Sequence, residues 1–203
     1  MLLDQYRIGP ALNFTYLVAT EEGGEGVVID PSYGIDPVLK AIDAKHVKVR
    51  FILNTHSHAD HTAGNADVRT RTGAKVVAHR VAPIGQDVSV EDGDRFKVGS
   101  LSFEVVHTPG HTKDSVLYVF EGNVATGDTL FVGECGRTDL PGGDPSEMYD
   151  SLLRRVIQLD DALVVLPGHD YGVTATSTIA REKKENYTLQ PRTRDEFLAF
   201  LRE

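Results

Sequence analysis

The stretch Thr55-His56-Ser57-His58-Ala59-Asp60-His61 places three imidazoles and one carboxylate within six residues. Imidazole and carboxylate groups are ligands that zinc, iron and manganese accept in proteins. The stretch follows an apolar run, residues 47–53, that predicts a buried strand. Candidate ligands on a loop directly after a strand are typical of active sites in α/β folds. The stretch therefore predicts a metal site at a strand end.

The composition is that of an ordinary globular protein, with 203 residues, of which 40% are hydrophobic and 25% charged. This length favours a single domain over residues 1–203 with a substantial core. The formal net charge of -9 argues against an extended nucleic-acid surface, and no apolar run has the length of a membrane span. Cys135 is the only cysteine, and we expect no signal peptide, so the sequence predicts a cytoplasmic protein without disulfides.

Turn residues divide the sequence into short strands and helices. Strands are expected at residues 13–19, 26–30, 47–54, 75–79, 101–107, 115–120, 123–126 and 162–166. Helices are expected at residues 35–44, 64–72, 176–185 and 193–202. One more helix should begin with Ser146 as its N-cap and bury Met148, Leu152, Leu153, Val156 and Ile157. Residues 127–145 are rich in glycine and proline, and their length is typical of a functional loop.

Three further motifs place a histidine or an aspartate beside glycine at the end of a predicted strand. They are Thr108-Pro109-Gly110-His111-Thr112, Thr126-Gly127-Asp128-Thr129-Leu130-Phe131 and Leu166-Pro167-Gly168-His169-Asp170. Glycine lets the backbone turn sharply and approach an ion closely. Together with the first stretch, these motifs offer five histidines and two aspartates, which is enough for two adjacent metal ions.

The order His-x-His-x-Asp-His, Pro-Gly-His, Gly-Asp and Gly-His resembles the signature of the metallo-β-lactamase superfamily over about residues 13–186. The resemblance implies an α/β (α+β) fold, a four-layer αββα sandwich with the metal ions at one edge between two sheets. It also implies two divalent ions, zinc first, with iron or manganese as alternatives. Such ions share a hydroxide of lowered pKa and stabilise an oxyanion. The implied ligands are His56, His58 and His111 for the first ion, Asp60, His61 and His169 for the second, and Asp128 between them.

Several residues around these ligands carry expectations of their own. Asp60 is expected to act in catalysis by holding or orienting the attacking water. Asp30 either orients a ligand histidine or simply ends a strand before Pro31. Cys135 is expected to be a small packed residue, because no histidine adjacent in sequence would activate it as a nucleophile.

Within the superfamily, residues 135–144 resemble the loop of glyoxalase II proteins, which are hydroxyacylglutathione hydrolases. The first five of these residues and Tyr171 also resemble the persulfide dioxygenases. The first resemblance implies thioester cleavage by a metal-bridging hydroxide. The second implies a single Fe(II), held by His56, His111 and Asp128, that oxidises glutathione persulfide. The complete ligand set and residues 140–144 favour the hydrolase, and a non-catalytic, metal-stabilised binding module is the third alternative.

The expected substrate is a small-thiol conjugate, of glutathione or of another low-molecular-weight thiol. Full-length glyoxalase II proteins add a basic C-terminal segment that grips glutathione, whereas this sequence continues for about one helix after Asn186. Arg137 is expected to meet a substrate carboxylate, with an ion pair to Asp139 or Asp144 as the alternative. Tyr171 is expected to donate a hydrogen bond at the mouth of the site or only to pack its rim. A homodimer is an expectation that rests on the resemblance alone.

Overall fold

Two six-stranded β-sheets form the centre of the molecule in the computed structural model, which describes residues 1–201. The first sheet contains, in spatial order, β1 (Leu2–Ile8), β2 (Asn13–Ala19), β3 (Glu25–Ile29), β4 (Lys48–Leu53), β5 (Lys75–His79) and β6 (Val88–Val90). The second contains β12 (Ser177–Thr178), β11 (Val164–Pro167), β10 (Asn123–Gly127), β9 (Val116–Phe120), β8 (Leu101–His107) and β7 (Arg95–Val98). Each half of the sequence therefore supplies one sheet.

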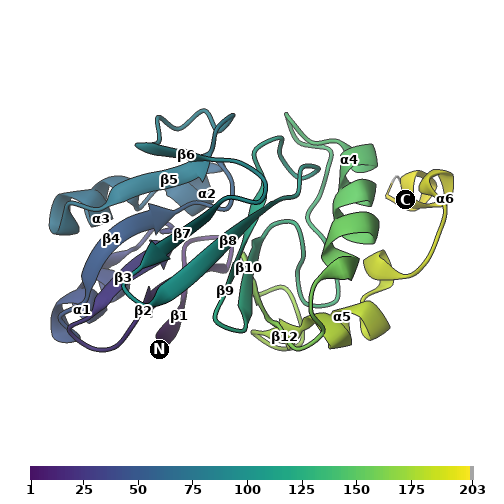
Figure 1. Cartoon of the computed structure of the whole chain (residues 1–203). Coiled ribbons are helices and arrows are strands. Elements are labelled where there is room, and N and C mark those ends of the chain that lie inside the picture. Colours follow the sequence, from purple (N-terminus) through teal and green to yellow (C-terminus); the bar gives the residue numbers. More distant parts are fainter. Residues whose placement is uncertain (202–203) are drawn as a thin grey trace.

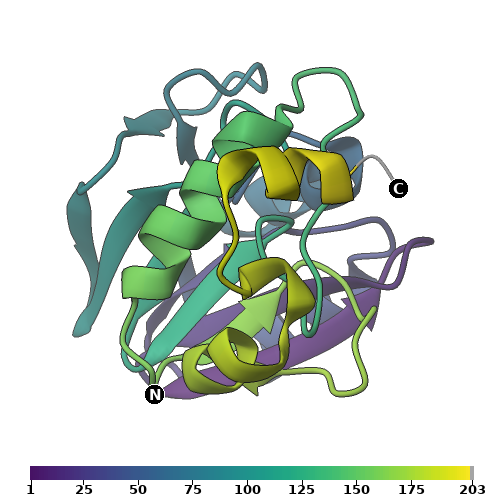
Figure 2. The same ribbon diagram turned by 90° about the vertical axis from the view of Figure 1, so that its right-hand side faces the viewer.

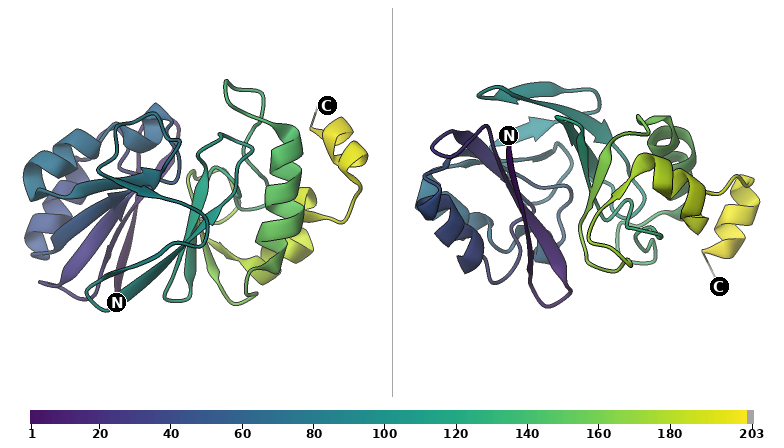
Figure 3. Two further views of the ribbon diagram at one scale, coloured as in Figure 1. Left: turned by 45° about the horizontal axis from the view of Figure 1, so that its top comes forward. Right: turned by 90° about the horizontal axis from the view of Figure 1, so that it is seen from below.

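Helices cover the outer face of each sheet (Figure 1 and Figure 3). The first sheet carries α1 (Asp36–Ala44) and α3 (Asn65–Thr72), and the short α2 (Ala59–Thr62) follows β4. The second sheet carries α5 (Ile179–Glu185) and α4 (Pro145–Asp150), which continues as a π turn (Ser151–Arg155) and a 3-10 turn (Val156–Gln158). A 3-10 turn (Tyr187–Leu189) leads to α6 (Arg194–Phe200), which packs against α4 on the side that faces the viewer in Figure 2. These layers confirm the αββα sandwich. Within residues 1–201, every helix is too short or too polar to cross a membrane.

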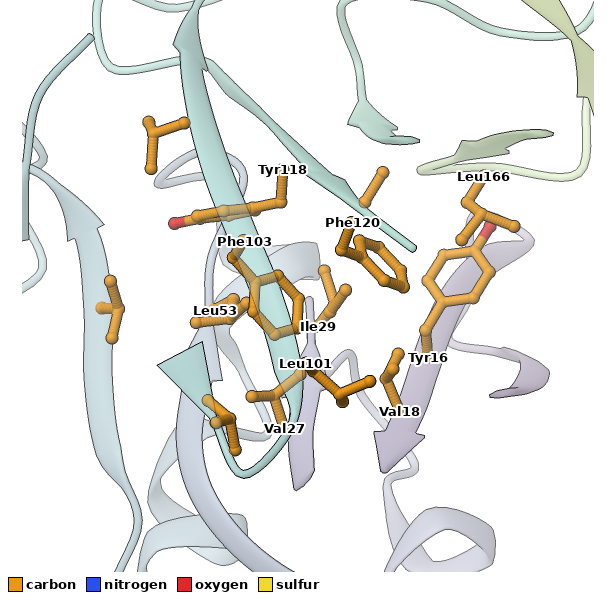
Figure 4. Packing of buried hydrophobic residues seen from close by; sticks show 14 of the residues in the cluster. Tyr16, Val18, Val27, Ile29, Leu53, Leu101, Phe103, Tyr118, Phe120 and Leu166 are labelled. Carbon is orange, nitrogen blue, oxygen red and sulfur yellow. The ribbon is translucent and has the colours of Figure 1, made fainter. Parts of the chain in front are cut away.

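Three apolar layers hold the sandwich together, and β2 contributes to two of them because all seven of its residues are buried. Tyr16 and Val18 face the other sheet, whereas Leu17 packs toward the first pair of helices. Successive side chains of a strand point to opposite faces, so a strand buried on both faces reads as a continuous apolar run. Figure 4 shows the layer between the sheets, where Phe103 and Tyr118 lie opposite the residues of the first sheet.

Replacement of Phe103 by alanine is expected to lower the free energy of unfolding by about 3–5 kcal/mol. Phe103 is buried, and its ring stacks on Phe96 at 5.2 Å and lies 5.0 Å from Phe120. Urea unfolding followed by circular dichroism would measure the loss. Phe96→Ala serves as the control, because Phe96 is only partly buried and should cost clearly less. Equal losses in the two variants would contradict this assignment of the core.

The main helix of the second half begins earlier than the sequence predicts. Asp144, and not Ser146, is the N-cap of α4: its carboxylate accepts hydrogen bonds from the backbone N–H groups of Ser146 and Glu147. Pro145 occupies the first turn, where its missing N–H costs nothing. Met148, Leu152 and Val156 are fully buried as expected, whereas Leu153 and Ile157 are only partly buried.

Four short or edge strands, β1, β6, β7 and β12, are absent from the sequence prediction. The predicted helix at residues 176–185 is partly wrong, because β12 comes first and α5 begins at Ile179. The predicted helix at residues 193–202 corresponds to α6, and residue 202 lies outside the described residues.

The loops that follow β4, β8, β10 and β11 meet at one edge of the sandwich. The N–H of Val116 donates to the carbonyl of Thr55 at 2.8 Å, and the N–H of Gly168 donates to the carbonyl of Gly127 at 2.9 Å. Gly127 has φ 48°, and a Cβ there would lie only 2.2 Å from the hydroxyl of Thr55. Only glycine allows this approach, which brings the predicted metal motifs together.

Candidate metal centre

The first predicted ligand set, His56, His58 and His111, forms one cluster. The Nδ1 atom of His58 lies 3.2 Å from Nε2 of His56 and 2.9 Å from Nε2 of His111. One nitrogen from each ring lies within 4.8 Å of the other two. His56 and His111 are buried, and His58 is partly exposed. The loop after β4 and the loop after β8 thus bring three imidazoles together across the two sheets.

The second predicted set, Asp60, His61 and His169, forms an adjacent cluster. Nε2 of His61 lies 3.1 Å from Nε2 of His169. Oδ2 of Asp60 lies 3.6 Å from Nε2 of His61 and 3.5 Å from Nε2 of His169. Asp60 and His61 are on α2, whereas His169 follows β11. The Asp60 side chain is 29% exposed, which makes it the open member of the cluster.

Asp128 lies between the two clusters, as its predicted bridging role requires. Its Oδ2 atom is 3.4 Å from Nε2 of His111 and 3.2 Å from Nε2 of His169, and its Oδ1 atom is 3.3 Å from Nε2 of His61. Burial alone would raise the pKa of Asp128, but His61 and His169 outweigh it and hold the pKa well below its usual range. The carboxylate therefore stays charged between the two ligand sets.

In three of the candidate ligand rings, the Nδ1 atom, which points away from the clusters, contacts an oxygen of the surrounding protein. Nδ1 of His111 contacts the carbonyl oxygen of Arg137 at 2.7 Å, and Nδ1 of His169 contacts that of Ala11 at 2.8 Å. A carbonyl oxygen only accepts, so each Nδ1 donates and leaves Nε2 with a lone pair toward the cluster. Nδ1 of His56 lies 3.1 Å from the hydroxyl of Thr55.

Asp30 completes this outer layer. Its Oδ2 atom lies 3.0 Å from Nδ1 of His61, and its carboxylate accepts from both the N–H and the hydroxyl of Thr55 at 2.7 and 2.6 Å. Asp30 therefore contacts the candidate ligand His61 directly, in the arrangement expected if it orients that ring. Asp30 also has φ 47°, a left-handed conformation directly after β3, and such conformations in a non-glycine residue are often found at functional sites.

The donor set fits divalent metal ions. Burial, followed by the neighbouring His61, lowers the pKa of His56 well below its usual value, so this ring is neutral, as a metal ligand must be. In the other cluster, burial opposes the charge on His61, but Asp128 and Asp30 outweigh it and raise its pKa to about 9. Two buried carboxylates therefore favour a cation at this position. Oδ1 of Asp128 is buried without a hydrogen-bond donor of normal geometry, which leaves an acceptor for an ion.

A cavity of about 340 Å³ opens beside the two clusters, and both predicted substrate residues line it. Tyr171 stacks on the ring of His169 at 4.7 Å and meets Phe131 edge to face. The guanidinium of Arg137 forms two hydrogen bonds to Asp139, at 2.6 and 2.7 Å, in the ion pair expected as its alternative role. A substrate carboxylate would have to compete with Asp139 for this group.

One contact at the site was not expected from the sequence. Asn13, at the start of β2, donates from its side chain to Asp60, although the sequence predicts only a strand for this run. The available signal in the sequence was an amide side chain at the start of a largely apolar run. His79 and His107, the last residues of β5 and β8, stack on each other at 4.0 Å and belong to none of the clusters of candidate metal ligands.

Cys135 is expected to resist alkylation by iodoacetamide at pH 7.5 in the folded protein. It is 7% exposed, and burial, with the adjacent Glu134, raises the pKa of its thiol to about 12. Because the thiolate is the reacting form, almost none is present below pH 10. Mass spectrometry after timed alkylation would show reaction only once urea unfolds the chain. Rapid modification of the folded protein would contradict this assignment.

Comparison with known proteins agrees with this geometry. The family model of the metallo-beta-lactamase superfamily matches residues 8–83 and 80–169. A hydroxyacylglutathione hydrolase of Anaeromyxobacter dehalogenans is 42% identical over 173 residues, which cover 84% of this chain and 66%, just under two thirds, of that protein. The mitochondrial persulfide dioxygenase ETHE1 of Homo sapiens is 33% identical over 196 residues, which cover 95% of this chain and 76% of that protein.

A solved structure extends the likeness to three dimensions. The crystal structure of ETHE1 from Myxococcus xanthus has a TM-score of 0.94 to this chain and is 36% identical, over 100% of this chain and 91% of that one. The four-layer fold, the clustered histidines and aspartates and the family model all agree. The chain belongs to the metallo-β-lactamase superfamily.

Proposed function

We propose that this protein is a metal-dependent hydrolase that cleaves the thioester of a small-thiol conjugate. The observation that carries the proposal is the pair of ligand clusters with one buried carboxylate, Asp128, in contact with both. His56, His58 and His111 would hold one ion, and Asp60, His61 and His169 the other. Two divalent ions would supply a hydroxide at neutral pH and polarise the thioester carbonyl.

The protein's own residues would position the substrate and the attacking water. Asp60 is the one charged ligand with substantial exposure to the cavity, so its carboxylate can hold the water and accept a proton from it. Burial, with Asp128 and Asp60, raises the pKa of Tyr171, so its phenol stays protonated and can donate a hydrogen bond at the cavity mouth. Arg137 supplies positive charge on the opposite loop for a carboxylate of the thiol carrier.

The hydroxyacylglutathione hydrolase relative supports a thioester of glutathione or of a similar thiol as the substrate class. A second candidate, a persulfide dioxygenase, is favoured by the TM-score of 0.94 to an ETHE1 structure and by the human dioxygenase relative. In that case His56, His111 and Asp128 would hold a single Fe(II). Oδ2 of Asp128 lies 4.0 Å from Nε2 of His56 and 3.4 Å from Nε2 of His111, so this smaller set is also assembled.

Metal content and two assays distinguish these functions. Protein purified without added metal would be analysed for zinc, iron and manganese, then assayed for hydrolysis of a hydroxyacylglutathione and for oxygen uptake with glutathione persulfide. About two ions per chain with thioester cleavage is the expected result. One iron per chain, with oxygen uptake and no thioester cleavage, would show instead that the protein is a persulfide dioxygenase. Metal that raises the melting temperature, without turnover of either substrate, would point to a binding module.

A further inference from the structure

We propose that Asn13 is a positioning residue for the second metal site, the one formed by Asp60, His61 and His169. This inference rests on the proposed two-metal centre and concerns only one half of it. The Nδ2 group of Asn13 donates to Oδ2 of Asp60 at 2.9 Å. Among the described residues this is the only hydrogen bond to the Asp60 side chain, which is otherwise free to turn toward solvent.

The orientation of the Asn13 amide is fixed by its surroundings. The charged form of Asp60 only accepts hydrogen bonds, so the amide must present its NH₂ group and not its oxygen. On the other side, a Cβ on Gly9 would lie 2.7 Å from Oδ1 of Asn13, so the backbone of the β1–β2 turn closes directly against the amide. Asn13 itself is 0% exposed. A buried, enclosed donor holds its acceptor more rigidly than a surface side chain would.

The same segment also holds the other end of the cluster through its backbone. The N–H of Phe14 donates to the carbonyl of Gly168 at 2.8 Å, and the N–H of Asp170 donates to that of Leu12 at 2.9 Å. Asn13 pairs with His169 as an isolated β-bridge. Because these bonds use the main chain, a substitution of the Asn13 side chain leaves them in place and removes only the support of Asp60.

The oxygen that Asn13 contacts is the one that faces the other two ligands, at 3.5 and 3.6 Å from their ring nitrogens. One lone pair of this atom is used by the amide, which directs the other toward the cluster. Loss of such an outer contact typically weakens metal binding 10–100-fold. The first site has separate supports, on Thr55 and on the carbonyl of Arg137, and should not respond.

The test is a titration of metal-free protein with zinc against a competing chelator, on wild type, Asn13→Leu and Asn123→Ala. Leucine has the same branched arrangement of heavy atoms as asparagine, without the donor. Asn123 is a buried asparagine at the far end of β10, bonded to the carbonyl of Glu121, and serves as the matched control. We expect Asn13→Leu to weaken the second zinc 10–100-fold, to leave the first within threefold, and to keep the metal-free melting temperature near that of the control.

A second arm uses Asp60→Ala as the background. There the amide has lost its partner, so adding Asn13→Leu should change zinc affinity no further, a non-additive result. Equal weakening of both zinc ions by Asn13→Leu would mean that Asn13 serves only the fold and would overturn the inference. Unchanged binding of both ions would do so too. Wild-type protein that binds only one zinc would instead overturn the two-metal centre, and the Asn13 role with it.

Discussion

Asp128→Asn is expected to lower kcat/KM for thioester cleavage at least about 10³-fold and to reduce the metal content of both sites. Asp128 is the only residue within the described part of the chain whose oxygens lie within 3.4 Å of ring nitrogens from both clusters. Asparagine has the same shape but no charge, and its NH₂ group would face imidazole lone pairs. A 10³-fold loss corresponds to about 4 kcal/mol of lost transition-state stabilisation, which agrees with the several kcal/mol that metal ions contribute to such reactions.

Asp114→Asn is the matched control for this variant. Asp114 is also buried, at 4% exposed, and accepts a hydrogen bond at 3.1 Å from Ser57, which lies between two ligand histidines. It contributes no atom to either cluster, so we expect it to keep both metals and to lose less than tenfold in kcat/KM. Elemental analysis and steady-state kinetics on both variants make the comparison. Wild-type metal content in Asp128→Asn would rule out the bridging role.

The seven candidate ligands were predictable because each lies in a contiguous motif with its own chemical logic. His56 and Asp60, for example, stand on one loop that follows an apolar strand, and Gly127 and Gly168 mark where the chain must turn tightly. Their convergence follows from topology: the loops after β4, β8, β10 and β11 meet at the same edge of the sandwich. The strand expected at residues 13–19 is β2, and the structure buries all seven of its residues.

Asp30 was a candidate support from the sequence, but the backbone contacts that hold the other rings were not predictable, because they depend on atoms brought together by the fold. The carbonyls of Ala11 and Arg137 carry no sequence signal, since every residue has one. The start of α4 was misplaced for a related reason: Asp144 and Ser146 are both good N-caps, and the N-cap is Asp144 because Pro145 fits the first turn. The edge strand β1 was missed because Asp4 interrupts its apolar positions, and in the fold this carboxylate is paired with Lys45 at 2.5 Å.

Neither sequence nor fold alone separates a two-metal hydrolase from a one-iron oxygenase, because one ligand set contains the other. A pair of histidine variants does separate them. His111 and His169 are closely matched: they are 2% and 3% exposed, each donates from Nδ1 to a backbone carbonyl, and each lies near Oδ2 of Asp128, at 3.4 and 3.2 Å. His111 belongs to the ligand set in both functions, whereas His169 belongs to it only in the hydrolase.

If the protein is a two-metal hydrolase, His111→Ala and His169→Ala should each lower kcat/KM at least about 10³-fold, because either loss removes an ion that polarises the carbonyl or supplies hydroxide. If it is a persulfide dioxygenase, only His111→Ala should abolish oxygen uptake, and His169→Ala should lose less than tenfold. The melting temperature of each metal-free variant controls for unfolding, since both side chains are equally buried. Full thioesterase activity in His169→Ala would exclude the second ion from the reaction, whatever the metal content of the wild-type protein.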